Sequence, residues 1–524
     1  MKSASYGLDD SSVVVVIGSG AGGGTLAREL CTRGIRVVLL EAGRQVEAAE
    51  FRNDDFFAFG QLSWLDPRTS SGGSEITKLS PAMPAWTVKA VGGSTVHWGA
   101  LAYRMQAHEF AARTHYGEIA GAALADWPLK LEDLDPWYEL AEARMGVTGT
   151  HDIPRLPVSN HYKVFWNGAT RIGYKHVSND RHAINSEPRD GRPACLALGF
   201  CTAGCKSTAK WSTLYTEIPA AEATGRLDLR TGAMALQIEH DAKGRVSGVV
   251  YADSAGAHQR QRAALVCVAG NGVETPRLLL NSASNLFPHG LANGSGMVGR
   301  HFMKHMNALI FGMFERPVHM ERGPTATGTV FDEGRFDPRR GFAGGYLMQS
   351  SHVGLPSFGV GAKPGAWGAD FAHWVEHYAQ LAGVWMNGED LPMRGNAVSL
   401  DDSTRDSHGL PVAHLHMDDH PNDLAMRAHF FKQARALLGA AGAREYLECP
   451  PFPASHTMGT CRMSKRDADG VVDAYGRSHQ IRNLFISDGS SFVTASAQNP
   501  TLTIVALALR QARHVADSLA RRDT

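Results

Sequence analysis

The sequence has no excess of charge of either sign and no long hydrophobic run. Its 52 Lys and Arg residues equal its 52 Asp and Glu residues, so the chain carries no net field that would recruit nucleic acid or an acidic membrane surface. Apolar stretches such as 502–509 are too short to span a membrane, and residues 1–12 lack the charged-then-apolar pattern of a secretion signal. We therefore expect a small-molecule substrate, no nucleic-acid partner and no transmembrane segment.

Cysteine is also scarce, and the chain shows no internal repeat or low-complexity tract. Seven cysteines in 524 residues do not make a disulfide framework. The chain is much longer than one typical domain, so we expect two closely packed domains. Four of the cysteines are scattered in segments that look buried or adjacent to the site: Cys31, Cys267, Cys449 and Cys461.

A dinucleotide-binding βαβ unit opens the chain. The apolar run 13–17 enters a G-x-G-x-x-G turn formed by Gly18, Gly20 and Gly23, a helix follows, and a second apolar run ends at Glu41. The glycines allow a pyrophosphate to approach the helix N-terminus, and Glu41 is placed to hold ribose hydroxyls. The alternative is a glycine-rich turn without a ligand, and the glycines alone do not separate FAD from NAD.

A second glycine-rich turn, Gly92-Gly93-Ser94, precedes His97 and Trp98. Its backbone N–H groups are candidates for cradling the edge of a cofactor ring or its phosphates. The alternative is an ordinary loop. His97 is either a neighbour of the cofactor or a packed core histidine, and the flanking glycines favour the former because they allow close backbone approach.

Three cysteines follow the pattern C-x5-C-x3-C at Cys195, Cys201 and Cys205. They are candidates for holding one iron–sulfur cluster, and three ligands fit a three-iron cluster better than a four-iron one. A zinc site normally needs four ligands, and no fourth Cys or His stands at finger spacing. A disulfide with one free thiol, or three buried thiols, remain open as alternatives.

The middle of the chain contains strands and then an inserted domain. Residues 263–269 predict a buried strand that returns to the parallel sheet, followed by a helix with Thr275 as N-cap and Pro276 in its first turn. From about 302 to 450 no βαβ unit is visible, which favours an antiparallel substrate domain with a helix over 422–438. The expected strands of a meander are 227–230, 235–239 and 246–251; a surface helix is expected within 127–146.

The chemistry is expected near the C-terminus. His456 precedes Gly459, the pair Asp488-Gly489 follows an apolar run, and Asn499 with Pro500 predicts a helix N-cap and a first-turn proline. The helix that follows is apolar on every face, so it should be buried with its positive end pointing inward.

These motifs, in this order along the chain, resemble the glucose-methanol-choline (GMC) oxidoreductase family. The resemblance implies FAD and an α/β fold, α+β overall, with a Rossmann-like FAD-binding domain and an inserted substrate domain on a six-stranded antiparallel sheet. The implied division is a discontinuous FAD-binding domain over 1–110, 195–300 and 455–524, an excursion or cap that approaches the cluster over 111–194, and a substrate-binding domain over 301–454.

The resemblance also implies roles for single residues. His456 matches the catalytic histidine, which takes the hydroxyl proton while the carbinol hydride passes to the flavin, and an imidazole suits that task. Asn499 matches its partner, which holds the same oxygen. The cofactor-binding residues expected are Gly18, Gly20, Gly23, Glu41, Gly92, Gly93, Ser94, His97, Ala235, Asp488, Gly489, Asn499, Pro500 and Thr501.

Within the family, the cysteine run resembles that of catalytic subunits of bacterial membrane-linked sugar dehydrogenases. This implies a [3Fe-4S] cluster on Cys195, Cys201 and Cys205, a cytochrome c acceptor, and a small export subunit that carries the protein to the periplasm; without a partner it is cytoplasmic. Lys206 departs from the proline common there, and some members without a cluster also have a short cysteine pair here. The turn at His97 is also similar to that of fungal pyranose oxidases, in which a histidine is bonded to the flavin; the sequence leaves this open.

The sequence thus favours an FAD-dependent dehydrogenase that oxidises a secondary alcohol of a sugar or glycoside. Dehydrogenases that oxidise glycosides at C3 are the first subgroup to test. The alternatives are an oxidase of pyranose-oxidase type without a cluster, which returns electrons to O2, and a silent flavin-binding subunit. The substrate, its regiochemistry, the natural acceptor and the oligomeric state cannot be deduced from the sequence.

Overall fold

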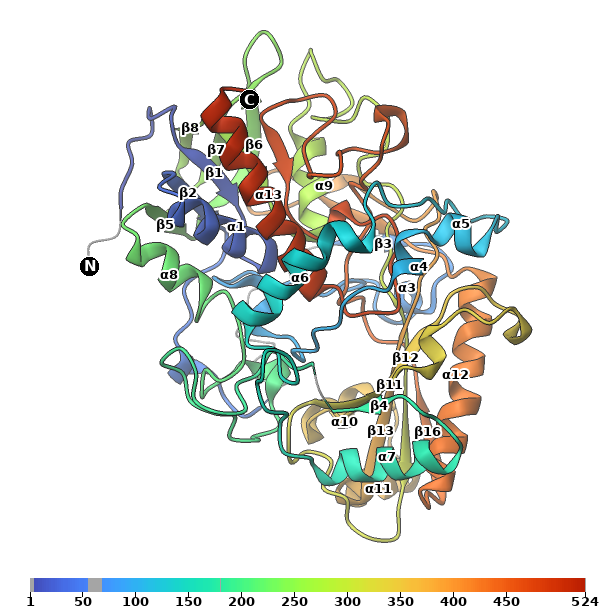
Figure 1. Ribbon diagram of the computed structural model, residues 1–524. Coiled ribbons are helices and arrows are strands. Elements are labelled where there is room, and N and C mark those ends of the chain that lie inside the picture. Colours follow the sequence, from blue (N-terminus) through green and yellow to red (C-terminus); the bar gives the residue numbers. More distant parts are fainter. Residues whose placement is uncertain (1–3, 55–67, 180, 524) are drawn as a thin grey trace.

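The computed structural model describes residues 4–54, 68–179 and 181–523. One half, the parallel-sheet domain, is built on a five-stranded parallel sheet in the order β17-β9-β1-β2-β5, with strands from both ends of the chain (Figure 1). The strands are β1 (Val14–Ile17), β2 (Val37–Glu41), β5 (Leu227–Thr231), β9 (Leu265–Val268) and β17 (Leu484–Ile486).

The central strands of this sheet are buried on both faces, which is why they read as unbroken apolar runs. Val14 and Val16 pack toward α1 (Ala21–Thr32) and α13 (Thr501–Arg521). Val15 and Ile17 pack in the other core, together with residues of an antiparallel meander. The meander consists of β6 (Met234–His240), β7 (Val246–Ala252) and β8 (His258–Arg262).

The other half, the six-stranded-sheet domain, is built on the strand order β16-β10-β13-β12-β11-β4, in which every pairing is antiparallel. Ala308 and Ile310 belong to one core, and the alternating residues Leu309 and Phe311 belong to another. The strands are β4 (Val177–Ser178), β10 (Met306–Met313), β11 (Ala326–Val330), β12 (Tyr346–Ser351), β13 (Leu381–Gly388) and β16 (Glu445–Cys449).

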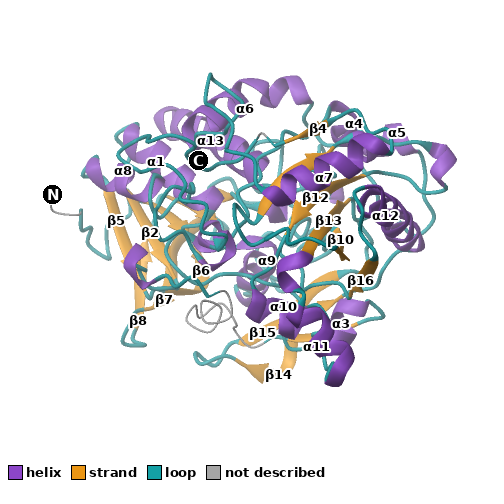
Figure 2. Ribbon diagram, turned by 90° about the horizontal axis from the view of Figure 1, so that it is seen from below, coloured by secondary structure: helices purple, strands orange, loops and turns teal. Residues whose placement is uncertain are grey.

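Helices cover both faces of the six-stranded sheet. On one face α12 (Pro421–Ala440) packs against β10 and β13, and α7 (Asn160–Arg171) packs against β11 and β13. On the other, α10 (Leu355–Gly361) and α11 (Gly368–Glu376) supply Phe358 and Trp374. Figure 2 shows the two sheets on opposite sides of the molecule, with α9 between them and α12 at the outer side.

A small third sheet joins distant segments, because β3 (Thr69–Ser71) pairs with β15 (Pro411–His416), which pairs with β14 (Ala397–Arg405). This sheet packs on α9 (Asn271–Asn281) of the parallel-sheet domain. The other α-helices in the described part of the chain are α3 (Glu75–Leu79), α4 (Ala107–Phe110), α5 (Ala112–Tyr116), α6 (Leu131–Met145) and α8 (Glu217–Ala223).

The predicted fold class is confirmed, with corrections in detail. The strand at 227–230 was wrongly assigned to the meander: as β5 it pairs in parallel with β2 at the edge of the main sheet. Thr275 does not cap α9, which begins at Asn271; the Asn271 side chain accepts the N–H groups of Val273 and Glu274 instead. The helices expected within 127–146 and over 422–438 are confirmed as α6 and α12.

The segment 111–194 is divided between the two domains. Its helix α6 packs against α13, whereas α7 and β4 belong to the six-stranded-sheet domain. Within the described ranges, no helix is both long enough and apolar enough to cross a membrane.

Candidate active site

A cavity of about 450 Å3 lies between the two domains, within the size range of small-molecule and cofactor sites. The turn between β1 and α1 forms one wall. The six-stranded sheet contributes Leu309, Gln349 and Trp385 to the lining, one from each of β10, β12 and β13. The cavity therefore brings the dinucleotide turn and the inserted sheet to one space.

Most of the residues expected to bind the cofactor line this cavity. Gly23 and Gly92 are not among the lining residues, and both lie behind it in close packing with other backbone and side-chain atoms. Those that line it are Gly18, Gly20, Glu41, Gly93, Ser94, His97, Ala235, Asp488, Gly489, Asn499, Pro500 and Thr501.

Glu41 lies at the C-terminal end of β2 and is tied to the first glycine turn. Its Oε2 accepts the backbone N–H of Ser19 at 3.0 Å and the Ser19 hydroxyl at 2.6 Å, and its Oε1 accepts the N–H of Gly43 at 2.8 Å. Burial raises the pKa of Glu41, and these bonds oppose the rise. The carboxyl group is thus fixed at the position where the βαβ motif holds a ribose.

The two glycine-rich turns contact each other directly. The Gly92 N–H donates to the Ser19 hydroxyl at 2.9 Å, and a Cβ on Gly93 would lie 2.9 Å from the Cα of Gly20. Gly93 also has a φ of +51°, a region that side-chain-bearing residues rarely adopt. Gly93 therefore has to be glycine for the two turns to form one continuous backbone wall.

His97 also lines the cavity, and its two ring nitrogens have different surroundings. Its Nδ1 lies 2.6 Å from the carbonyl oxygen of Thr202, and because a carbonyl only accepts, Nδ1 carries the proton. Its Nε2 is buried and has no hydrogen-bond partner among the described residues. Burial and the nearby Lys210 lower the pKa of His97 to about 3, so the ring is neutral.

The N-terminal end of α13 also lines the cavity, next to the first turn of α1. The helix begins at Thr501 with Pro500 as its N-cap, and Pro500, Thr501 and Ile504 line the cavity. The free N–H groups of this buried first turn favour a negative charge. The prediction that Asn499 caps this helix is wrong, because its Oδ1 accepts a hydrogen bond from Gln349 Nε2 at 2.7 Å.

His456 and Asn499 both line the cavity, although they come from different loops. Burial lowers the pKa of His456 well below its ordinary value, and His305 adds to the effect. The Nδ1 atoms of His456 and His305 lie 2.7 Å apart. An imidazole that stays neutral at physiological pH is suited to accept a proton from a substrate.

The cysteine loop, residues 195–205, lies next to this site. The Thr202 carbonyl that binds His97 belongs to it, and all three sulfurs accept backbone N–H groups. The donors are Ala197 to Cys195 at 3.4 Å, Thr325 to Cys201 at 3.5 Å, and Lys210 to Cys205 at 3.4 Å. Burial raises the pKa of Cys195 to about 11, with smaller contributions from the other two cysteines. All seven cysteines are free.

Lys210 links the cysteine loop to the cavity wall. Its buried ammonium donates to the carbonyl oxygens of Val96 at 2.9 Å and Trp98 at 3.0 Å, and also to that of Cys201. Burial lowers the pKa of Lys210 to about 8, although Cys201 and Cys205 raise it. The loop is therefore held rigidly against the segment that carries His97.

Three residues at or behind the cavity wall could not be predicted from the sequence: His305, Gln349 and Lys210. None of them belongs to a local motif, and each acts on a partner that is distant in sequence or on backbone atoms. The only signals available were polar residues in segments otherwise rich in apolar residues, and these do not identify a partner.

The residues present fit FAD. The cavity offers two backbone walls without side chains, a fixed carboxyl at the end of β2 and two helix N-termini, those of α1 and α13. These are the features that bind the pyrophosphate and ribose of a dinucleotide.

Comparison with known proteins agrees with this geometry. Models of the N-terminal and C-terminal parts of GMC oxidoreductases match residues 69–307 and 392–508. The chain is 34% identical to 2-methyl-1,2-propanediol dehydrogenase of Mycolicibacterium austroafricanum, over 97% of this chain and 95% of that protein. It is 28% identical to the fructose dehydrogenase large subunit of Gluconobacter japonicus, over 97% of this chain and 98% of that protein.

The solved structure of pyridoxine 4-oxidase from Mesorbium loti has the same fold, with a TM-score of 0.64 and 18% identity over 96% of this chain and 98% of that chain. The relatives include named dehydrogenases and oxidases, and the family implies FAD. From the two family matches and the near full-length relatives, we conclude that this chain is an enzyme of the GMC oxidoreductase family.

Proposed function

We propose that the protein is an FAD-dependent dehydrogenase that oxidises a secondary alcohol of a sugar or glycoside, with C3 as the first position to test. The observation that carries the proposal is that His456 and Asn499 face the same cavity as the dinucleotide turn. Relatives named for fructose, gluconate and a diol support an alcohol substrate. Trp385 and Phe452 in the cavity lining offer flat apolar surface for a sugar ring.

In the proposed reaction, the neutral imidazole of His456 takes the hydroxyl proton, and Asn499 holds the same oxygen by a hydrogen bond. Bound FAD supplies the acceptor for the carbinol hydride. The walls of the two domains enclose the reacting atoms and limit the access of water. Removing the hydroxyl proton is required because an alcohol is a poor hydride donor until its O–H bond is breaking.

The proposal predicts that His456→Ala retains FAD but reduces it 10² to 10⁴ times more slowly, about the usual contribution of a general base. The measurement is anaerobic bleaching of the flavin by methyl α-D-glucopyranoside or D-fructose, which carry secondary hydroxyl groups, or by 2-methyl-1,2-propanediol, whose oxidisable hydroxyl is primary. His258→Ala, on the exposed edge strand β8, is the control and should behave as the wild type. A wild-type rate in His456→Ala would remove this residue from the mechanism.

A [3Fe-4S] cluster on Cys195, Cys201 and Cys205 is part of the proposal, and it would carry electrons away from the site. The support is the three partly exposed sulfurs that accept backbone N–H groups, as the sulfur ligands of iron–sulfur clusters do. The trio is not among the groups of described residues whose ligand atoms all lie within 4.8 Å of one another.

The matching experiment is iron analysis and an EPR spectrum of protein purified without air. Cys201→Ser should leave reduction of the flavin by substrate intact and stop transfer to cytochrome c. Cys31→Ala removes a cysteine outside the loop and should leave both steps unchanged. Absence of iron from the wild type would refute the cluster without affecting the role of His456.

We extend the proposal to a cytochrome c acceptor, a small export subunit and work in the periplasm, or in the cytoplasm if no such partner exists. Its support is that two relatives are named as one component of a larger enzyme, a large subunit and a flavoprotein. The rival function is an oxidase of pyranose-oxidase type without a cluster, which relatives named oxidases favour. Peroxide formation in air by iron-free protein would support the oxidase.

A further inference from the structure

His305 lies directly behind the candidate base and occupies an unusual backbone position. It precedes β10, is 2% exposed and has a φ of +61°. Its Nδ1 lies 2.7 Å from His456 Nδ1, and its Nε2 lies 2.9 Å from the carbonyl oxygen of Ala495. The two imidazole rings are nearly perpendicular, at 89°. His305 thus bridges the catalytic histidine and the backbone.

The directions of these two hydrogen bonds follow from the chemistry of the partners and from the neutral state of the buried His305. The Ala495 carbonyl can only accept, so His305 carries its proton on Nε2. Burial lowers the pKa of His305, and a neutral imidazole has one N–H, so Nδ1 of His305 is an acceptor. His456 must then donate from Nδ1, and its Nε2 retains the lone pair.

We propose that His305 is a positioning residue that fixes His456 in the Nδ1–H tautomer, so that Nε2 is the atom that takes the proton of the alcohol. This inference rests on the proposed function of His456. The same bond persists after proton transfer, because the His456 imidazolium still donates from Nδ1 to His305. The O–H bond of the alcohol breaks, the new N–H bond forms at His456 Nε2, and no proton needs to move elsewhere during the step.

The partner residue is oriented in a complementary way. Gln349 Nε2 donates to Asn499 Oδ1 at 2.7 Å, which leaves the Asn499 amide N–H groups as donors. An alcohol oxygen in the cavity therefore meets one acceptor, His456 Nε2, and one donor, Asn499 Nδ2. This pair matches a hydroxyl group, which donates one hydrogen and accepts another.

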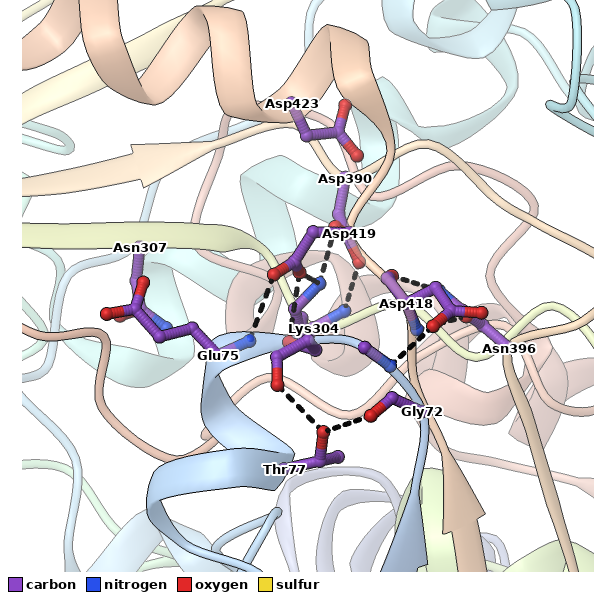
Figure 3. A network of polar contacts seen from close by, with 12 residues as sticks. Gly72, Glu75, Thr77, Lys304, Asn307, Asp390, Asn396, Asp418, Asp419 and Asp423 are labelled. Atoms are coloured by element: carbon purple, nitrogen blue, oxygen red, sulfur yellow. Dashed lines mark hydrogen bonds and ion pairs between the residues drawn. The ribbon is translucent and has the colours of Figure 1, made fainter.

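Both ends of the bridge are held rigidly. The preceding residue, Lys304, is anchored by its N–H to Asp390 Oδ2 at 2.9 Å and by Nζ to Asp390 at 3.0 Å and Asp419 at 3.1 Å (Figure 3). At the other end, Glu109 accepts the N–H of Ala497 at 2.8 Å, two residues after the carbonyl that binds His305. The tautomer therefore depends on fixed groups rather than on solvent.

The test compares two variants at the same position. In His305→Asn, the side-chain oxygen takes the place of Nδ1 as an acceptor, and asparagine tolerates positive φ. His305→Leu keeps the apolar bulk but offers no acceptor to His456. In serine proteases, losing the group that fixes the tautomer of the catalytic histidine lowers kcat about 10⁴-fold, so we expect His305→Leu to slow flavin reduction by about 10²-fold to 10⁴-fold and His305→Asn to recover most of the rate.

The rates are measured anaerobically with the fastest of the three alcohols named above, at saturation, together with FAD content and thermal unfolding. The loss should lie in the reduction rate constant and not in the substrate concentration for half-maximal rate. Equal rates for the wild type and His305→Leu, or equal losses for Leu and Asn in folded FAD-bound protein, would overturn the inference.

A second measurement needs neither substrate nor variants at His305. In wild-type holoenzyme labelled with 15N-histidine, the signals that disappear in His456→Ala report its tautomer, and we expect a protonated Nδ1 with a bare Nε2. A protonated Nε2 would overturn the inference even if the alcohols reduce the flavin. Conversely, failure of all three alcohols to bleach the wild type would count against the proposed function. The tautomer of His456 would then decide the inference about His305.

Discussion

The buried charge cluster next to His305 allows a quantitative test of the structure. Lys304 is 2% exposed, and its two carboxylate partners, Asp390 and Asp419, are 3% and 10% exposed. Lys304→Met keeps the length and apolar stem of the side chain and removes only the charge. Because two buried carboxylates are then left without their cation, we expect a loss of about 3–5 kcal/mol in the free energy of unfolding at pH 7, which is typical of broken buried ion pairs.

The loss should depend on pH in a defined direction. Burial alone would raise the pKa of Asp419, but Lys304 and hydrogen bonds hold it below its ordinary value. A lowered carboxyl pKa contributes stability at pH values above the pKa of the unfolded chain. That stability is lost as the pH falls through the lower pKa of the folded protein. In the wild type this contribution is still present at pH 4. In Lys304→Met burial acts without the cation and raises the pKa of the Asp419 carboxyl above its value in the unfolded chain, so the variant regains stability and its difference from the wild type should shrink as the pH is lowered from 7 toward 4.

The assay is urea unfolding followed by tryptophan fluorescence, with linear extrapolation. Arg339→Met, which breaks an exposed pair with Asp337, is the control and should cause no measurable change. Adding Asp390→Asn to Lys304→Met should restore part of the stability, since one uncompensated charge is removed. A loss below about 1 kcal/mol, or one that is the same at pH 4 and pH 7, would refute the assignment of a buried cation held by these carboxylates.

Two further predictions concern a buried carboxyl pair outside the cavity lining, Glu389 with Glu109, and the glycine turn at Gly93. Burial raises the pKa of Glu389 and of its neighbour Glu109. A raised acid pKa contributes stability that is lost as the pH rises from the pKa of the unfolded chain, about 4.5, through the pKa of the folded protein. In Glu389→Gln the melting temperature should therefore fall less between pH 5 and about 9 than in the wild type, and an unchanged pH dependence would contradict this. Gly93→Ala should lose at least about tenfold in FAD affinity because its Cβ would lie 2.9 Å from Gly20, whereas Gly395→Ala, with open space around it, should retain FAD; the absorbance ratio at 450 and 280 nm measures both.

The parts of the fold that could be predicted from the sequence are those with a short-range cause. The run at 14–17 has four buried residues, which predicts a central parallel strand, and the turn after it contains glycines that the close packing requires. The strand at 227–231 was misplaced because alternation of apolar and polar residues indicates a half-buried strand but not its neighbour. Its pairing with β2 is a property of the assembled sheet.

In the candidate site, too, residues in local motifs could be predicted from the sequence, and residues that act through distant contacts could not. His456 and Asn499 could be identified because each lies in a recognisable motif. His305 and Gln349, which orient them, contact residues 151 and 150 positions away, and no spacing rule connects such pairs. Asn499 also lost its predicted role as a helix cap for a long-range reason, since Gln349 occupies its side-chain oxygen.

The order of strands in the parallel sheet has a consequence for biosynthesis. β1 is made near the start of translation, yet β9, which pairs with it, ends at residue 268, and β17 and α13 follow only after residue 483. The wall that α13 adds to the cavity thus exists only after residues 500–504 have been synthesised. The complete cofactor site therefore requires both ends of the sheet to be in place, and any route that moves the holoenzyme between compartments has to accept a folded cargo.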